Sequence, residues 1–186
     1  KPFYLKANLR YDGISTKNIF SNESILIDIV RSQILNNQNL NVKIDLDVKD
    51  ITNSNELNNL HLEINLEQGD ISLTNSKINW KDDLEFSLDD ALLNYDGGEI
   101  SLIGKLRVNI KNINNFYQSF QVKKSHRKKI KNVELDFVYN FNKNQFRFDN
   151  VKVDKKSNSE IDEFITKYNR SKKKLSADLI GRGGAW

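Results

Sequence analysis

The chain contains no cysteine among its 186 residues. Disulfide bridges, thiolate nucleophiles and cysteine-ligated zinc or iron–sulfur sites are therefore excluded. Histidine is also scarce, with only His61 and His126. Neither histidine has a metal-binding partner at helical or hairpin spacing, so we expect both on the surface. The sequence predicts no metal site and no cofactor.

Methionine is absent as well, and the first residues already have the pattern of a strand. We therefore expect the chain to be a fragment of a longer protein, without that protein's N-terminal export signal or membrane anchor. No run approaches the roughly 20 apolar residues of a membrane-spanning helix. The composition, 38% hydrophobic and 29% charged, is typical of a chain that folds rather than of a disordered one.

Catalytic signatures are missing too. Asp82–Asp83 and Asp89–Asp90 are paired carboxylates, but they fall at the ends of predicted strands, where aspartate usually serves turns. The glycines of residues 181–184 lack the Gly-Lys-Ser/Thr sequence of a phosphate loop. No nucleophile motif of the hydrolase type is present. The sequence therefore predicts that the protein is not an enzyme and has no small-molecule substrate.

Alternation of apolar and polar residues is the dominant pattern. In residues 40–49 every second position is apolar: Leu40, Val42, Ile44, Leu46 and Val48. This period is typical of a strand with one dry face and one wet face. It recurs in about nine short stretches separated by polar turns, which predicts a mainly β fold built as an antiparallel meander sheet.

Three segments break the alternation. Residues 22–35 and 112–120 have apolar residues at helical spacing, which predicts short helices within a β-sheet domain covering residues 1–154. Residues 155–175 predict a C-terminal helix. Residues 176–186 are rich in glycine and have no periodicity, so we expect an irregular tail there.

The order Gly-acid-Ile-Ser-Leu occurs twice, at residues 69–73 and 98–102. Glycine permits the positive φ of a tight turn, and the Ile and Leu would begin a dry row. We interpret the repeat as two equivalent hairpin starts, with Gly104 easing a bend after the second. The alternative is coincidence within a sequence rich in Ile, Leu, Asn and Lys.

A continuous apolar sheet face must be covered. Helices, a second sheet or lipid could cover it. The predicted helices are few and short, so we expect the sheet to curl, leaving a groove that is open or partly closed. An ordinary closed core is the alternative. The candidates for the groove lining are the apolar residues of the central strands: Leu62, Ile64, Leu66, Ile71, Leu73, Ile78, Trp80, Phe86, Ile100, Leu102, Leu106, Val108, Leu135 and Phe137.

Two stretches, residues 60–112 and 130–154, resemble the C-terminal region of AsmA-like proteins of the bacterial envelope. The family's hairpin pattern is matched by Gly98, Glu99, Ile100 and Gly104, whereas Asn75 and Ser76 replace the glycine step in the first copy. The resemblance covers roughly residues 14–175, and residues 179–186 depart from it. It implies a curled β-sheet with an apolar groove, a periplasmic location, and an N-terminal tether to the inner membrane. It also implies phospholipid transport that supports outer-membrane integrity, so the expected partners are phospholipid and membrane.

The net charge is +4, and the excess of basic residues is concentrated in residues 123–129 and 172–174. Five side chains there are candidates to bind anionic headgroups: Lys123, Lys124, Arg127, Lys128 and Lys129. A solvated loop is the simpler interpretation. A nucleic-acid-binding β domain is another alternative, but no aromatic residues are interleaved with the cations, so we expect no nucleic-acid partner. A structural module of an outer-membrane or adhesin-type protein also remains open, because strands there alternate too.

Overall fold

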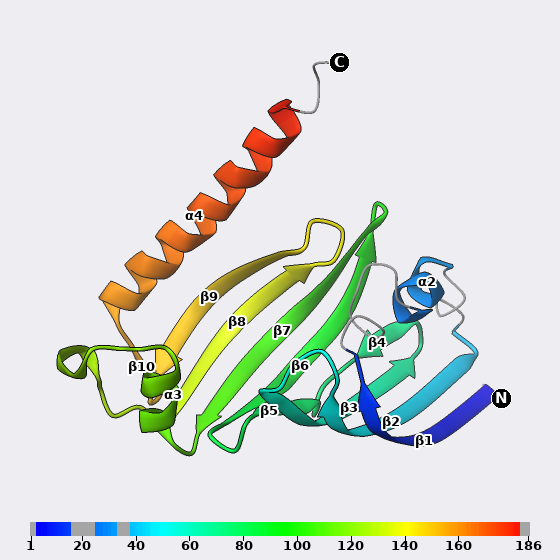
Figure 1. Cartoon of the computed structure of the whole chain (residues 1–186). Coiled ribbons are helices and arrows are strands. Elements are labelled where there is room, and N and C mark those ends of the chain that lie inside the picture. The colour runs from blue at the N-terminus through cyan, green and yellow to red at the C-terminus, as the bar shows by residue number, and fades with distance from the viewer. Residues whose placement is uncertain (1–2, 16–24, 33–37, 183–186) are drawn as a thin grey trace.

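The computed structural model describes residues 3–15, 25–32 and 38–182 (Figure 1). The strands are β1 (Phe3–Ile14), β2 (Leu40–Ile51), β3 (Leu57–Glu67), β4 (Asp70–Ser72), β5 (Lys77–Trp80), β6 (Leu84–Asp96), β7 (Glu99–Ile110), β8 (Asn132–Asn140), β9 (Gln145–Val153) and β10 (Lys156–Ser157). The helices are α2 (Ile25–Arg31), α3 (Ile113–Ser119) and α4 (Ser159–Arg182), with a 3₁₀ turn at Lys124–His126. Among these elements, no helix is both long and apolar enough to cross a membrane.

All ten strands belong to one sheet, in the order β1-β2-β3-β4-β6-β7-β8-β9-β10, with β5 pairing to β3 and β6. Most neighbours in the sheet are neighbours along the chain, apart from the β3–β5 and β4–β6 pairs, so the predicted mainly β meander is confirmed. The sheet is mixed rather than wholly antiparallel, because β1 runs parallel to β2. A parallel pair needs a crossover of a dozen residues or more, and residues 15–39 provide it. The sequence pattern indicated a helix in that segment but not a crossover.

The predicted helices are found, with different limits. Helix α2 lies inside the predicted range 22–35, of which residues 22–24 and 33–35 lie outside the described part of the chain. Helix α3 matches the prediction for residues 112–120, and the Asn112 side chain caps it by accepting from the Asn115 N–H at 3.4 Å.

Helix α4 continues to Arg182, so the predicted irregular tail at 176–186 is wrong as far as that residue. Residues 183–186 lie outside the described ranges. The prediction relied on apolar periodicity, which ends near residue 175. Lys, Leu and Ala are strong helix formers, and their intrinsic propensity favours a helix without an apolar stripe.

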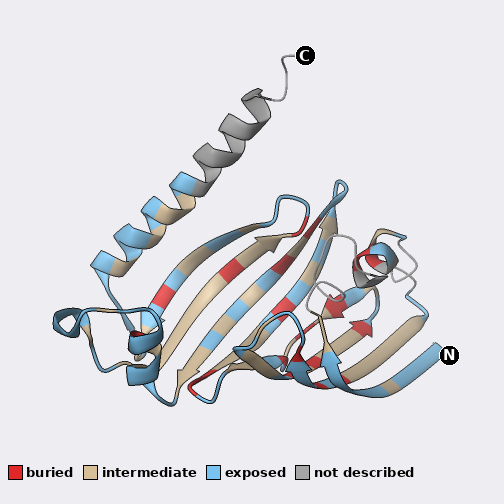
Figure 2. Ribbon diagram, viewed as in Figure 1, coloured by how far each residue is buried: buried red, intermediate tan, exposed pale blue. Residues whose placement is uncertain are grey.

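One face of the sheet is apolar across its whole width, because the register aligns the apolar residues of adjacent strands. Leu46 lies opposite Leu62, and Leu106 lies between Leu88 and Leu135. The sheet curls around this face, so that Leu62 of β3 lines the same cavity as residues of β9. Buried residues gather on the central strands and on α2, whereas β1 is mostly exposed (Figure 2).

The hydrophobic core occupies part of the curl, where α2 contributes Ile27 and Val30. The largest fully buried side chains are Ile27, Leu62, Leu73 and Ile100. Full burial of an Ile or Leu stabilises the fold by roughly 1.5–3 kcal/mol relative to exposure. Burial of these four side chains therefore stabilises the curled sheet.

The two Gly-acid-Ile-Ser-Leu copies are both hairpin starts, as the sequence predicts. Gly69 (φ +94°) turns the chain from β3 into β4, and Gly98 (φ +84°) turns it from β6 into β7. The isoleucines that follow, Ile71 and Ile100, are 6% and 0% exposed. Each copy therefore places its first apolar side chain in the same core.

Gly104 sits opposite a bulge rather than at a bend. Between the pairs Asp89–Lys105 and Leu92–Ile103, two residues of β6 oppose Gly104 alone. A Cβ on Gly104 would lie 2.7 Å from the Ala91 Cα, so only glycine leaves room for the bulged strand. The prediction that Asp89–Asp90 end a strand is therefore wrong, because both residues lie within β6.

Candidate functional site: an open apolar trough

A trough of about 380 Å³ lies on the inner face of the curled sheet and is open to solvent on one side. Its volume is within the range of about 300–1,000 Å³ that is common for ligand pockets. Most of its lining comes from strands β3, β6, β7, β8 and β9: Leu60, Leu62, Ser76, Lys77, Ile78, Phe86, Leu88, Leu102, Leu106, Phe137, Tyr139, Phe141, Phe146 and Phe148. Apart from Ser76, Lys77 and the Tyr139 hydroxyl, these side chains are hydrocarbon.

Aromatic side chains of the β8–β9 hairpin form one wall of the trough. The ring centroids of Tyr139 and Phe146 are 4.3 Å apart, and those of Phe146 and Phe148 are 5.7 Å apart. Tyr139 donates its hydroxyl hydrogen to Asn144 Oδ1 at 2.9 Å, and burial of the ring raises its pKa above the ordinary value. The wall is therefore apolar, with its one hydroxyl satisfied within the hairpin.

The structure brings six of the predicted lining residues to the trough: Leu62, Ile78, Phe86, Leu102, Leu106 and Phe137. Of these six, Leu62, Leu102 and Phe137 also belong to the hydrophobic core. Four other predicted residues belong to the core without lining the trough: Leu66, Ile71, Leu73 and Ile100. The reason is that the sheet curls on itself there and α2 packs against the same core. The remaining four are half-buried outside the trough lining: Ile64, Trp80, Val108 and Leu135.

The sequence prediction missed eight lining residues: Leu60, Ser76, Lys77, Leu88, Tyr139, Phe141, Phe146 and Phe148. A signal for the aromatic ones was present, because residues 133–141 alternate strictly and residues 145–148 return after a turn. The alternation does not predict that these aromatic residues lie across the trough from β3, since this depends on how far the sheet curls.

The predicted headgroup ligands lie away from the trough, in the connection between α3 and β8. Lys123, Lys124, Lys128 and Lys129 are exposed, and none of the five candidates lines the trough. Arg127 is half-buried and donates from Nε to the Val122 carbonyl at 2.9 Å. The basic segment is therefore a second, separate surface.

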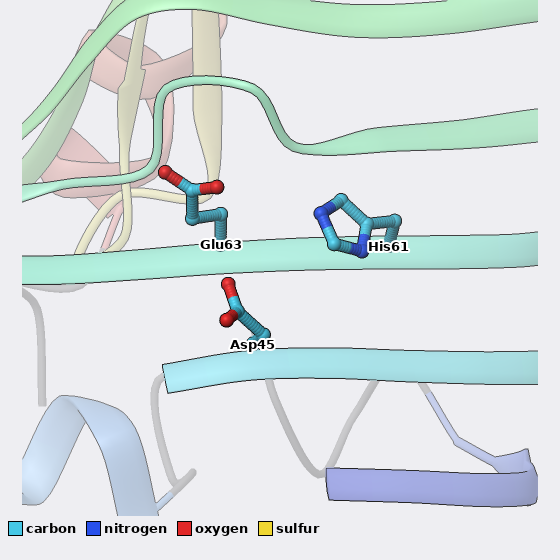
Figure 3. A group of neighbouring side chains, drawn as sticks. All are labelled: Asp45, His61 and Glu63. Carbon is cyan, nitrogen blue, oxygen red and sulfur yellow. The ribbon is translucent and has the colours of Figure 1, made fainter. Parts of the chain in front are cut away.

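A polar cluster lies on the opposite face of the sheet (Figure 3). Ligand atoms of Asp45, His61 and Glu63 are all within 4.8 Å of one another. His61 Nδ1 is also 2.8 Å from Asp47 Oδ1. The prediction that His61 has no partner at hairpin spacing is therefore wrong, because the β2–β3 register sets Asp47 opposite His61 and Asp45 opposite Glu63.

An imidazole and two carboxylates are suitable ligands for a divalent cation. Here, however, the Lys43 ammonium lies 3.5 Å from Glu63 and 3.9 Å from Asp45. The hydrogen bond from the Asn65 amide, together with the Lys43 charge, lowers the pKa of Glu63 below its ordinary value. The protein's own groups thus compensate the carboxylates, and we interpret the cluster as a cross-strand charge ladder.

Comparisons of the chain with protein-family models, with curated proteins and with solved structures gave no match. The resemblance to AsmA-like proteins therefore stays a prediction, and the chemistry of the trough is the basis for assigning a function.

Proposed function

We propose that this chain is a non-catalytic lipid-handling segment that holds the acyl chain of a phospholipid in the trough. The observation that carries the proposal is an open cavity of about 380 Å³ with an almost wholly hydrocarbon lining. Phospholipid transport to an outer membrane, tethering to an inner membrane and support of outer-membrane integrity are the finer parts of this proposal. They rest on the AsmA-like resemblance.

Acyl chains fit the trough better than polar metabolites do. Each CH₂ group removed from water contributes about 0.8 kcal/mol, so an extended chain lying along the sheet gains affinity with every carbon. A polar metabolite would lose hydrogen bonds to water and find only Ser76, Lys77 and Tyr139 to replace them. Lys77 is exposed where it borders the trough, so its ammonium can contact a lipid phosphate.

The proposal is tested by placing a charge in the trough. Phe146 lines the cavity but is 45% exposed, so Phe146→Asp should leave the fold intact. Affinity for a fluorescent acyl-chain probe should fall at least about tenfold, equivalent to 1.4 kcal/mol. Lipid extracted from the purified protein should fall in parallel, as measured by mass spectrometry.

Phe164→Asp is the matched control, because Phe164 is 67% exposed on α4 and does not line the trough. This variant should bind the probe like the unmodified protein. Thermal unfolding of both variants separates loss of binding from loss of folding. Equal probe affinity in the two folded variants, or no probe binding by the unmodified chain, would refute the assignment.

A further inference from the structure

A basic tip stands out from the charge distribution of the chain. Residues 111–131 contain seven of the 29 Lys and Arg residues and none of the 25 acidic ones. The remainder of the chain therefore has 22 cationic and 25 acidic side chains, a net charge of −3. We define the tip as α3, residues 120–131 and the neighbouring Trp80. It lies at the end of the sheet where β8 begins (Figure 1).

The backbone of the tip is fixed against α3. The Tyr117 hydroxyl donates to the Lys128 carbonyl at 2.7 Å and accepts from the Lys128 N–H at 3.1 Å. Arg127 lies over the Tyr117 ring, with its guanidinium carbon 5.9 Å from the ring centroid. Arg127 thus stabilises the loop, while the four lysines project from a backbone that is already ordered.

The side-chain ammonium groups of those four lysines form no ion pair within the described part of the chain. The nearby acids are already engaged. The Asp83 carboxylate accepts from the Asn115 amide at 2.8 Å.

Asp154 accepts from the backbone N–H groups of Asn132 and Lys131, at 3.0 and 2.9 Å. No ion pair in the described part of the chain joins Asp83 or Asp154 to the four lysines.

An exposed aromatic residue accompanies the charge. Phe120, at the C-terminal end of α3, is 60% exposed. Its ring lies 4.7 Å from Phe116 and 5.9 Å from Trp80. The Lys81 ammonium lies 4.8 Å from the Trp80 ring centroid. Aromatic rings bordered by lysines are typical of surfaces that enter the headgroup layer of a membrane.

We propose that the tip docks on the surface of an anionic membrane, with Phe120 in the headgroup layer and the four lysines facing lipid phosphates. Charge complementarity identifies the partner, because such membranes attract clusters of basic residues. Surfaces that bind single-stranded nucleic acid interleave aromatic rings with the cations, whereas residues 123–131 contain no Phe, Tyr or Trp, so a membrane is the better match. This inference does not depend on the trough, which contains no residue of the tip.

The test is sedimentation with vesicles of phosphatidylcholine, with and without phosphatidylglycerol. The unmodified chain should bind the anionic vesicles, less so at high salt. A variant with Lys123, Lys124, Lys128 and Lys129 all changed to Gln should bind at least about tenfold more weakly. The control changes four exposed lysines outside the tip, Lys6, Lys49, Lys105 and Lys152, to Gln. It has the same net charge as the tip variant and should keep its binding.

Trp80 provides a second readout, because the chain has only one other tryptophan, Trp186. In a Trp186→Phe background, Trp80 emission should shift to the blue on anionic vesicles, and Phe120→Ser should reduce the shift.

Equal vesicle binding by the tip variant and its control would overturn the proposal. So would binding to single-stranded RNA without binding to vesicles. Phe146→Asp should keep vesicle binding, which separates this outcome from failure of the trough assignment.

Discussion

Gly104 leaves room for the backbone of Ala91, which bulges from β6 over β7. An added Cβ would lie 2.7 Å from the Ala91 Cα and 3.0 Å from its Cβ. Ala91 is fully buried, and the nearest atom belongs to the backbone, so no side-chain rotation relieves the overlap. The bulge and the fit of Ala91 into the core therefore depend on the absence of one methyl group.

Gly104→Ala should lower the free energy of unfolding by about 1–3 kcal/mol, the usual effect of overpacking a tight site. Urea unfolding measures this change. Gly97→Asn is the control, because Gly97 has a φ of +56° and no heavy atom within 4 Å of an added Cβ. Asn tolerates this conformation, so the control should change stability by less than about 1 kcal/mol. An unfolding midpoint for Gly104→Ala equal to that of the parent chain would contradict the packing argument.

Single residues were predictable from sequence where local chemistry decides their place. The glycines at positions 69 and 98 belong to tight turns, and turn chemistry is local. The role of Gly104 was not predictable, because it depends on a register shift in the neighbouring strand. The same register shift interrupts the alternation of β6 at Asp89 and Asp90, which is why the sequence pattern predicted the end of a strand there.

Helix α4 contacts the edge strand β9 through the Asn169 amide and through Tyr168, whose ring centroid lies 5.7 Å from that of Phe148. Asn169 Nδ2 donates to the Phe148 carbonyl at 2.7 Å, and Asn169 Oδ1 accepts from the Phe148 N–H at 3.2 Å. The amide therefore makes the two hydrogen bonds that a further strand would make at this point of β9. Unpaired edge groups promote association between sheets, so this contact also protects the edge.

Asn169→Ala should leave both backbone groups of Phe148 without their protein partner and lower stability by about 1–3 kcal/mol. Hydrogen exchange in β9 should become faster, which mass spectrometry of peptides covering residues 145–153 would detect. Arg170→Ala, at the exposed next position of the helix, should leave exchange in β9 unchanged. If both variants exchange at the same rate in β9, the amide contact is not what holds the helix to the sheet.

Elements were easier to predict than their partners. Residues 159–169 indicate a helix by their spacing, but nothing in them indicates that Asn169 meets β9. The parallel pairing of β1 is a similar case, because its alternation is compatible with either direction. Pairing direction depends on the connection, and the connection contains residues that the pattern assigned to a helix.

The molecule as a whole should be sensitive to acid. Hydrogen bonds from Lys143 and Asn140 lower the pKa of Glu99, and those from the backbone at residues 132 and 131 lower the pKa of Asp154. With Glu63, these carboxylates lie on different parts of the sheet. Each holds fewer protons in the folded than in the unfolded chain when the pH is near its ordinary pKa.

Their stabilising effect should be complete above about pH 4.5, the ordinary pKa of glutamate, and should be lost as the pH falls through the folded-state values. At the alkaline end, the raised pKa of Tyr139 means that ionisation opposes folding, so stability should also fall as the pH rises above 10. Urea midpoints measured from acid to alkali should therefore show a plateau between these limits. Greater stability at pH 3 than at pH 7 would disagree with these assignments.

For the whole molecule, the sequence predicted that the sheet has an apolar face but not which part of that face is covered by the core. The alternation of residues 40–49 and 133–141 determines which side chains share a face. Whether Leu73 is sealed and Phe146 is open depends on the twist accumulated over many strands and on the position of α2. The alternation within a single strand contains no information about the total twist of the sheet or the position of α2.

The strand order has a consequence for how the protein forms. The hairpins β2–β3, β6–β7 and β8–β9 have loops of two to five residues, whereas the β1–β2 crossover and the 21 residues between β7 and β8 are long connections. Only these two connections must close a long loop before their strands can pair. A short loop costs little entropy to close, which favours folding that begins at these hairpins. During synthesis each hairpin can accordingly form as soon as its second strand has been made, whereas β1 must wait for the crossover and β2 before it finds a partner.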